Sequence, residues 1–280
     1  MKRIITVQDI SCVGKCSLTV ALPIISAAGV ECGVLPTAVL STHTKFAKFT
    51  FCDLTEEIEP ISKTHKELDI DFDAIYTGYL GSFEQLSLVS DMIDRYRSDK
   101  LTVVIDPAMA DNGKIYYGFT PEFAKAMAEL CSKADLIIPN LTEASFMLGI
   151  HYTEEYDEDH IKDVLKRLCA LGPRRAAITG ISFDPKKLGV YAYDKETDEF
   201  FYYANERIPV SYHGTGDIYA SATVGALMRG HSVESALAVA VDFTLECIKR
   251  TVEDENRRDY GVNFEEALGY YITRLENKQI

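Results

Sequence analysis

A glycine-rich turn with an acidic end is the part of this chain most suited to chemistry. It reads Gly214-Thr215-Gly216-Asp217, and the small and apolar residues that follow, 218–228, predict a closely packed helix. The two glycines let backbone N–H groups turn inward, and a helix N-terminus adds about half a positive elementary charge. The turn could therefore hold an anion beside the carboxylate of Asp217. An ordinary turn capped by an aspartate is an equally weighted alternative.

Two familiar phosphate-binding motifs do not match the sequence. A dinucleotide-binding fingerprint requires a glycine three residues after Gly216, and that position holds Tyr219. The Gly14-Lys15 pair resembles the end of a P-loop, but Cys16 stands where that motif requires Ser or Thr. If a nucleotide binds to this chain, it binds by another route.

The composition is that of a globular protein with an acidic charge. The chain has 280 residues, a net charge of −14 and 47% hydrophobic residues. We expect no nucleic-acid partner, because no basic patch is visible. We expect neither a signal peptide nor a membrane span, because no apolar run approaches the ~18 residues that a span requires. The seven cysteines form no C-x-x-C pair, which favours reduced thiols and a cytoplasmic location.

Strand-like and helical segments alternate along the chain. Strands are predicted at 3–8, 33–40, 73–77, 101–105, 136–138 and 175–179, and a hairpin at 189–203. Helices are predicted at 17–28, 55–67, 84–96, 121–132 and 157–171, with another opening at 139–143 and two or three more from 217 onward. The alternation predicts a three-layer, doubly wound α/β fold, with a mostly parallel central sheet and helices on both faces. No repeat or linker interrupts it, so we expect one domain over residues 1–280.

Polar residues stand just after many of the predicted strands. They are Asp9, Ser11, His43, Thr44, Tyr79, Asp106, Asp111, Asn140, Glu143 and Thr179. In folds of this class, ligands bind outside the carboxyl ends of the strands. Each residue has a plain structural explanation when it is taken alone. For Asn140 and Glu143 that explanation is a helix-capping pair, which we favour for the two in isolation. The shared placement of the whole set nevertheless predicts one site.

Phosphoryl transfer is the chemistry that this set would support. The reaction requires positioning, neutralisation of the charge on the moving phosphoryl group, and a base for the acceptor hydroxyl. We expect the amides of Gly214–Gly216 to hold the phosphoryl group and Asp217 to take the proton. Asp106, Asp111 and Glu143 are candidates to hold Mg²⁺, directly or through waters.

Five segments together resemble the pyridoxal and pyridoxamine kinases of the ribokinase-like superfamily. They are Gly214–Asp217, Ser41-Thr42-His43-Thr44, Thr77-Gly78-Tyr79, Asp106-Pro107-Ala108-Met109 and Pro139-Asn140-x-x-Glu143. The segments occur in that family's order across nearly the whole chain. The resemblance implies ATP-dependent phosphorylation of the 5′-hydroxymethyl group of pyridoxal, pyridoxamine or pyridoxine. It also implies a homodimer without a separate lid domain.

The resemblance implies roles for single residues by their position. Asp217 is the expected catalytic base, and Thr44, Tyr79 and His43 are expected to line the pyridine pocket. The residues expected to face ATP and its metal are Asp106, Asp111, Asn140, Glu143 and Thr179. Of these, Asp106 and Glu143 are the expected Mg²⁺ ligands. The sequence leaves open whether a monovalent cation is also required.

Two departures from that family concern the substrate. Gln8-Asp9 stands where the family commonly has Gln-Ser, and the pair Asp9 and Ser11 is closer to hydroxymethylpyrimidine kinases of the same superfamily, as is His213. We expect Asp9 and Ser11 to bind the substrate, with Asp9 favouring the cationic aminomethyl group of pyridoxamine. The alternatives are a hydroxymethylpyrimidine kinase, then a sugar kinase of the same fold or a non-catalytic nucleotide-binding protein. Segment 204–212 is a candidate to close over ATP.

Overall fold

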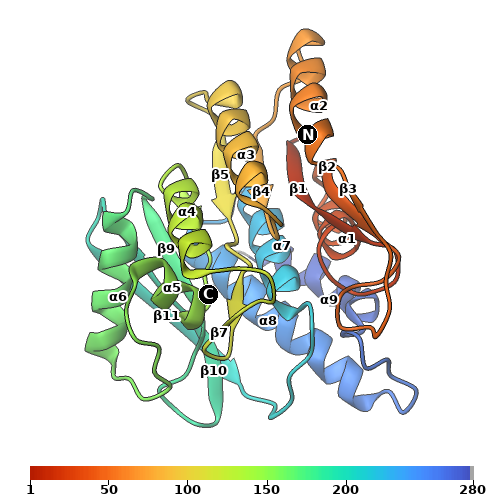
Figure 1. The fold of residues 1–280 in the computed structure, drawn as a ribbon. Coiled ribbons are helices and arrows are strands. Elements are labelled where there is room, and N and C mark those ends of the chain that lie inside the picture. The colour runs from red at the N-terminus through yellow and green to blue at the C-terminus, as the bar shows by residue number, and fades with distance from the viewer. Residues whose placement is uncertain (278–280) are drawn as a thin grey trace.

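The computed structural model describes residues 1–277 and places nine strands of them in one sheet, in the order β11-β10-β9-β8-β5-β4-β1-β2-β3 (Figure 1). The strands are β1 (Arg3–Ser11), β2 (Glu31–Leu40), β3 (Phe51–Asp53), β4 (Ala74–Thr77), β5 (Thr102–Ile105), β8 (Leu136–Ile137), β9 (Arg175–Ile181), β10 (Lys187–Asp194) and β11 (Glu199–Glu206). The six strands from β2 to β9 in this order pair in parallel, and β3, β10 and β11 add antiparallel edges. The predicted mostly parallel sheet is confirmed.

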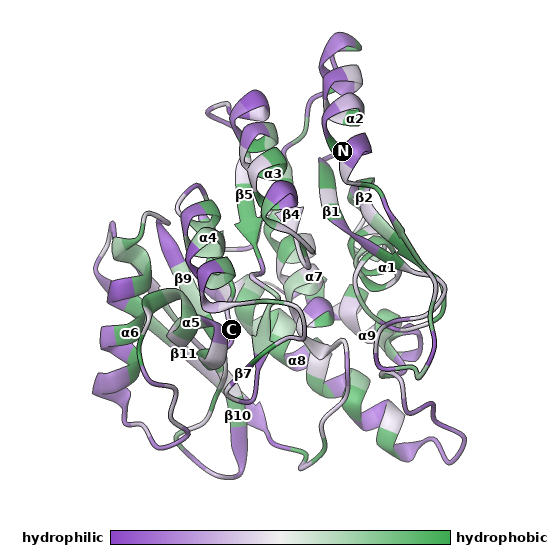
Figure 2. Cartoon of the chain, in the orientation of Figure 1, coloured by the Kyte–Doolittle hydropathy of each residue, from purple (hydrophilic) through white to green (hydrophobic). Residues whose placement is uncertain are grey.

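Helices cover both faces of the sheet, as predicted (Figure 1). One layer consists of α2 (Thr55–Glu67), α3 (Phe83–Tyr96), α4 (Pro121–Cys131), α5 (Leu141–Leu148) and α6 (Glu158–Ala170). The other consists of α1 (Leu18–Ala27), α7 (Thr215–Met228), α8 (Val233–Glu253) and α9 (Phe264–Glu276). Because successive strand residues point to opposite faces, neighbours such as Ile4 and Ile5 enter different apolar clusters. In Figure 2, β5 is accordingly hydrophobic, while the outer surface of α6 is hydrophilic.

The small residues of α7 allow that helix to be buried. Every residue from Ile218 to Ala226 is buried, and the helix packs between α1 and α8. A helix that is apolar all round is typical of a protein interior. The first turn of α7, which carries Asp217, therefore starts at a fixed place on the edge of the core.

The crevice of the sheet lies between β1 and β4. After β1 the chain passes through α1 and forms β2 on one side of β1, and later it forms β4 on the other side of β1. Ligands of such folds bind where the strand order reverses in this way. The pairing of β1 with β2 is irregular between Gln8 and Ile10. The extra residue lies on β2, where Thr37 and Ala38 stand opposite the single residue Asp9, so the local alternation of side chains changes next to Asp9.

Three short strands were not predicted. They are the edge strand β3 and the hairpin strands β6 (Ala110–Asp111) and β7 (Lys114–Ile115). Strands of two or three residues show no periodicity in a sequence, which explains the omission. In residues 1–277, none of the helices combines the length and the apolar character that a membrane crossing demands.

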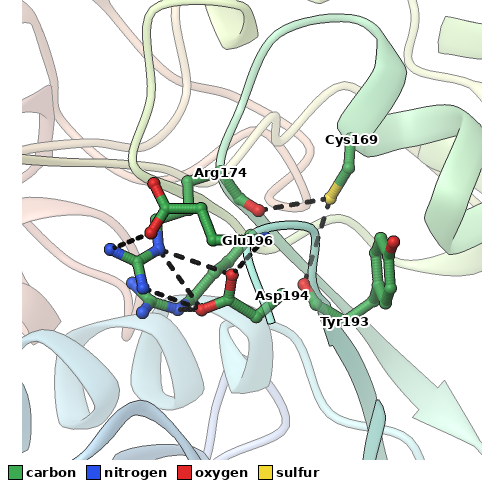
Figure 3. Close-up of polar contacts among 6 residues, drawn as sticks. Cys169, Arg174, Tyr193, Asp194 and Glu196 are labelled. Atoms are coloured by element: carbon green, nitrogen blue, oxygen red, sulfur yellow. Dashed lines mark hydrogen bonds and ion pairs between the residues drawn. The ribbon is translucent and has the colours of Figure 1, made fainter. Parts of the chain in front are cut away.

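An ion-pair cluster ties β9 to β10 where β9 begins, and so lies away from the strand ends of the crevice (Figure 3). The Asp194 carboxylate is 2.6 Å from the Arg175 guanidinium and 3.1 Å from that of Arg174, which also contacts Glu196 at 2.7 Å. The cluster holds the antiparallel edge of the sheet together, and we assign it no part in the site below.

Candidate active site

The glycine-rich turn forms the start of α7, and its two glycines differ in backbone conformation and in the space around them. Gly214 has a φ of +82°, and a Cβ there would lie 1.9 Å from the Lys15 carbonyl oxygen, so that only glycine fits. A hypothetical Cβ at Gly216 has no atom within 4 Å apart from its chain neighbours and the nearby backbone of α7. The first bond along the helix joins the Ile218 N–H to the Gly214 carbonyl at 3.1 Å. The amides of residues 215–217 thus have no helical acceptor, and two of them, those of Thr215 and Gly216, belong to the anion cradle predicted at Gly214–Gly216.

Asp217 lies in this first turn and is half-buried. The pKa of its carboxyl group is raised to about 7, mainly by burial and to a smaller extent by the charge of Asp9, against the opposing effect of the Ser17 backbone N–H. A carboxylate that titrates near neutral pH is suited to accept a proton from an alcohol.

Asp106 and Glu143 lie near Asp217. Burial raises the pKa of Asp106 well above its ordinary value, and the charges of Glu143 and Asp217 add to the shift. Burial also raises the pKa of Glu143, to about 7, while backbone N–H groups of Asn140, Met109 and Ala110 oppose it. Three carboxyl groups from β5, α5 and α7 therefore share one acidic region, as predicted from the strand ends.

The capping interpretation of Asn140 and Glu143 is confirmed. The Asn140 side chain accepts from the Glu143 N–H at 2.9 Å, and the Glu143 carboxylate accepts from the Asn140 N–H at 2.8 Å. Glu143 also accepts from the Met109 N–H at 3.1 Å, and Asn140 donates to the Ala110 carbonyl at 2.8 Å. The pair thus anchors the β6–β7 hairpin beside the acidic region.

Asp111, Thr179 and Tyr116 surround this region. Asp111 is exposed on β6 and accepts from Asn112, while Thr179 on β9 forms an isolated bridge with Asn140. The sequence interpretation missed Tyr116. Tyr116 is 40% exposed, and its pKa is raised by the burial of its other side and by the charges of Glu143, Asp111, Asp106 and Asp217, which act on it from this region. Only the unpredicted hairpin brings Tyr116 there, and no sequence signal indicated it.

Asp9, Ser11 and Tyr79 come together at the crevice, as predicted. The Ser11 hydroxyl donates to the buried Asp9 carboxylate at 3.2 Å. Burial raises the pKa of Asp9, and hydrogen bonds from the Ser17 and Ser11 hydroxyls oppose the shift. Burial and the nearby charge of Asp9 raise the pKa of Tyr79, whose ring stacks on Phe119 at 5.5 Å. The charge of Asp9 also acts on Asp217, so this group lies near the expected base.

His43 is buried with both ring nitrogens occupied. Its Nδ1 accepts from the Lys45 N–H at 3.1 Å, so the proton resides on Nε2, which donates to the Tyr260 carbonyl at 3.2 Å. Burial lowers the pKa of His43, in agreement with a neutral ring. The ring packs 4.5 Å from that of His213. His43 can therefore offer a ligand its ring surface but no nitrogen, and Thr44 beside it is exposed.

A cavity of about 610 Å³ lies beside the segment that precedes the cradle, and residues 214–217 do not line it. It is lined by Val210, Ser211, Tyr212, Glu255, Arg257, Arg258 and Asp259. Val210, Ser211 and Tyr212 belong to the segment predicted to close over ATP. This segment therefore faces the open space of the cavity, with the α8–α9 loop on the other side. Among residues 1–277, no group of three or more His, Cys, Asp or Glu side chains is arranged to hold a metal ion.

Comparison with known proteins gives concordant matches over nearly the whole chain. The family model of phosphomethylpyrimidine kinase matches residues 25–260. A pyridoxal kinase of Arabidopsis thaliana is 26% identical over 276 residues, which are 92% of this chain and 85% of the relative. A Bacteroides thetaiotaomicron protein assigned as a phosphomethylpyrimidine kinase, in crystals with pyridoxal, is 40% identical with a TM-score of 0.91, covering 96% and 95% of the two chains. Pyridoxal kinase of Lactobacillus plantarum is 28% identical with a TM-score of 0.90, covering 98% and 97%.

Proposed function

The chain belongs to the phosphomethylpyrimidine kinase family of phosphotransferases, and on this basis we propose that it phosphorylates the 5′-hydroxymethyl group of a B6 vitamer with ATP. The observation that carries the proposal is Asp217, a carboxylate with a pKa of about 7 at the start of a helix whose first amides have no helical acceptor. The similarity to pyridoxal kinases, and to a protein crystallised with pyridoxal, supports the choice of acceptor.

In the proposed reaction, the amides of residues 214–216 hold the γ-phosphoryl group of ATP. Asp217 removes the proton of the vitamer hydroxyl as its oxygen forms the new bond to phosphorus, and ADP leaves with the electron pair of the broken P–O bond. Open space around Gly216 lets a phosphate approach the backbone closely. Burial strengthens the interaction of these dipoles with the developing charge.

We propose that Mg²⁺ accompanies ATP on the side of Asp106. No cationic side chain in residues 1–277 offsets the burial and like charges that act on Asp106, so a divalent cation would stabilise its ionised form. Both carboxylate oxygens of Glu143 accept hydrogen bonds from backbone N–H groups. Glu143 would therefore contact the ion through a water molecule, which is a common arrangement for Mg²⁺. The bound ion would neutralise charge on the phosphates. Asp111, Asn140 and Thr179 would face the nucleotide from the surrounding loops.

Asp9, Ser11 and Tyr79 are proposed to hold the vitamer ring, with the His43 and His213 rings opposite. Asp9 is a buried carboxylate with serine hydroxyls as partners and no cation, which fits the aminomethyl group of pyridoxamine. We expect Asp9→Ser to lower the ratio of kcat/KM for pyridoxamine over pyridoxal by about tenfold, the value of one hydrogen bond to a charged group. An unchanged ratio would refute this role.

The proposed function is tested by ADP release with ATP and Mg²⁺ against a panel of acceptors. The panel contains pyridoxal, pyridoxamine, pyridoxine, hydroxymethylpyrimidine and ribose, with a reaction lacking acceptor as the control. We expect turnover with a B6 vitamer to exceed that with the other acceptors. Turnover of hydroxymethylpyrimidine alone would establish the second candidate, which the family match and the Asp9-Ile10-Ser11 sequence favour. The absence of turnover with every acceptor would favour the alternative that the chain is a non-catalytic nucleotide-binding protein.

We further propose a homodimer that works in the cytoplasm. Strand β3 forms an edge of the sheet, and Phe49, Phe51 and Val34 on or beside β2 and β3 are exposed by 45%, 56% and 39%. Exposed apolar groups on a free sheet edge favour pairing with another chain. The seven cysteines are all free thiols, in keeping with a reducing compartment.

A further inference from the structure

The lysine of the Gly14-Lys15 pair, which resembles the end of a P-loop in sequence, is bound to α9. Its ammonium donates to the Glu265 carboxylate at 2.8 Å and to the Asn263 side-chain oxygen at 3.3 Å. Asn263 immediately precedes α9 and Glu265 lies in its first turn, while the Lys15 side chain is only 16% exposed. The lysine is thus paired within the protein, unlike the phosphate-binding lysine of a P-loop.

The rest of Lys15 joins the start of α7 to the α8–α9 loop, residues 254–263. A Cβ on Gly261 would lie 2.4 Å from the Lys15 Cβ, so the loop passes directly over the lysine stem. The Lys15 carbonyl oxygen in turn would lie 1.9 Å from a Cβ on Gly214. Only glycine allows so close an approach at these two positions. One residue therefore packs against both the cradle and the loop.

The His43 ring is enclosed by the chain neighbours of these contacts. A Cβ on Gly14 would lie 2.5 Å from the His43 Cδ2, so the peptide next to Lys15 packs against the ring. From the loop, the Tyr260 carbonyl accepts from the His43 Nε2 at 3.2 Å. Gly14 precedes Lys15, and Tyr260 precedes Gly261. The contact between Lys15 and Gly261 therefore sets the distance between the two segments that enclose His43.

The anchor at Lys15 matters because the α8–α9 loop borders open space. Residues 255 and 257–259 line the cavity of about 610 Å³, and all of 255–259 are exposed. Asn263, in contrast, is buried, with its N–H donating to the Thr251 hydroxyl at 2.7 Å and its side chain to the Asp254 carboxylate at 2.9 Å. The bond from the Lys15 ammonium thus reaches the fixed end of the loop, next to the residues that contact His43.

We propose that Lys15 is a positioning residue of the acceptor pocket. Its bonds to the start of α9 hold the α8–α9 loop against the His43 ring and so fix the ring surface on which the vitamer would lie. The His213 ring, 4.5 Å from that of His43, is held in the same way, because Lys15 packs against the next residue, Gly214. The inference rests on the proposed function, in which both histidine rings face the vitamer, and adds a residue that touches neither substrate.

The role is tested by Lys15→Met, which removes the ammonium and keeps an unbranched stem beneath the loop. We expect KM for the accepted vitamer to rise about tenfold, the value of a lost charged hydrogen bond, while kcat and KM for ATP change less than about twofold. Lys15→Arg keeps the charge and should recover most of the loss. Lys63→Met, at an exposed ion-paired lysine of α2, is the control and should match wild type. An unchanged vitamer KM in Lys15→Met, or a loss confined to kcat or to KM for ATP, would overturn the proposal.

A second background separates a role through His43 from a general effect on stability. In His43→Ala, the further change Lys15→Met should raise the vitamer KM by less than about twofold, because the ring that the lysine positions is already gone. An equal rise in both backgrounds would contradict the proposal. Glu265→Gln is the milder variant if Lys15→Met does not fold, since Asn263 still accepts from the lysine. We expect it to raise the same KM about threefold, and no rise would count against the role.

A binding measurement keeps this test separate from that of the proposed function. Calorimetric titration without ATP gives the Kd of pyridoxal, or of hydroxymethylpyrimidine if that is the acceptor used, for wild type and Lys15→Met. We expect the Kd to rise about tenfold in the variant. If wild type binds pyridoxal but phosphorylates no acceptor, the proposed function fails and the two Kd values still decide the role of Lys15. Equal Kd values, or no binding of either compound by wild type, would overturn it.

Discussion

Asp217 is the residue on which the proposed chemistry depends. Replacing it by asparagine keeps the size of the side chain and removes its ability to accept a proton. We expect Asp217→Asn to lower kcat by roughly 10²–10⁴, the usual contribution of a general base, with ADP binding retained. Rates with the accepted vitamer and calorimetric ADP titration measure the two effects. Asp198→Asn, a change at an exposed aspartate, is the control, and near-normal turnover of Asp217→Asn would remove the base assignment.

The raised pKa of Asp217 has a consequence for stability. Its folded-state value of about 7 lies above the ordinary 3.8, so the folded protein holds a proton that the unfolded chain releases. Stability is therefore lost as the pH rises from about 4 through 7. Without nucleotide or divalent cation, we expect Asp217→Asn to melt several degrees above wild type at pH 8, for a gain of about 1–2 kcal/mol, and to match it near pH 4. A variant that melts no higher than wild type at pH 8 would contradict the burial of this charge.

At the scale of residues, the sequence predicted which side chains belong to the site but not their protonation, tautomers or hydrogen-bond partners. Asp9, Ser11, Tyr79, Asp106, Glu143 and Asp217 were all predicted, and the structure gathers them at the carboxyl ends of the strands. The tautomer of His43 could not be predicted, because its partner is the carbonyl of Tyr260, 217 residues away. Ser17 was interpreted as the start of a helix, and its φ of 50° just before α1 leaves no trace in the sequence. The roles of all these residues stay predictions until they are tested.

At the scale of elements, the two glycines at the start of α7 give a matched pair of variants. Gly214→Ala would place a Cβ 1.9 Å from the Lys15 carbonyl, at a φ that L-residues avoid, so we expect poor folding or a large fall in melting temperature. The new methyl group of Gly216→Ala would meet only its chain neighbours and the nearby backbone of α7. We expect this variant to fold normally and to lose turnover, because the new methyl group occupies the space of the phosphate. Full activity of a folded Gly216→Ala protein would exclude close phosphate contact there.

Long elements were predicted closely and short ones were missed. The pattern of residues 55–67 gave α2 with the bounds found in the structure, because its apolar face and its acidic first turn are clear. The strand predicted at 3–8 continues to Ser11, because Ile10 and Ser11, which were interpreted as part of a turn, still pair with β2 beyond the irregularity opposite Asp9. The β6–β7 hairpin is too short to show a pattern, and Tyr116 was missed with it.

At the scale of the whole molecule, the order and class of the elements followed from the alternation of strands and helices. The extent of each layer depends on long-range packing that local patterns do not encode. The single domain over residues 1–280 and the homodimer stay predictions. The choice between vitamers also goes beyond the sequence, since it depends on how the buried Asp9 carboxylate is held in three dimensions.

The proposed dimer surface can be tested by charge. We expect sedimentation equilibrium at micromolar concentration to give twice the chain mass for wild type and one chain mass for Phe51→Glu, since the charge would face an apolar partner surface. Phe83→Glu, at an exposed phenylalanine on α3, is the control and should remain dimeric. A monomeric wild type would reject the dimer, and a dimeric Phe51→Glu would place the interface elsewhere.

The most direct test of the account follows the phosphoryl group itself. Wild type is incubated with ATP labelled in its γ-phosphate, Mg²⁺ and an equal mixture of pyridoxal, pyridoxamine and hydroxymethylpyrimidine, and the labelled products are separated and identified by mass. We predict that the label appears in a vitamer 5′-phosphate, at a rate that Asp217→Asn reduces by roughly 10²–10⁴. Label found only in inorganic phosphate or in the pyrimidine product would contradict a B6 kinase, and equal labelling by the Asp217→Asn protein would contradict its mechanism.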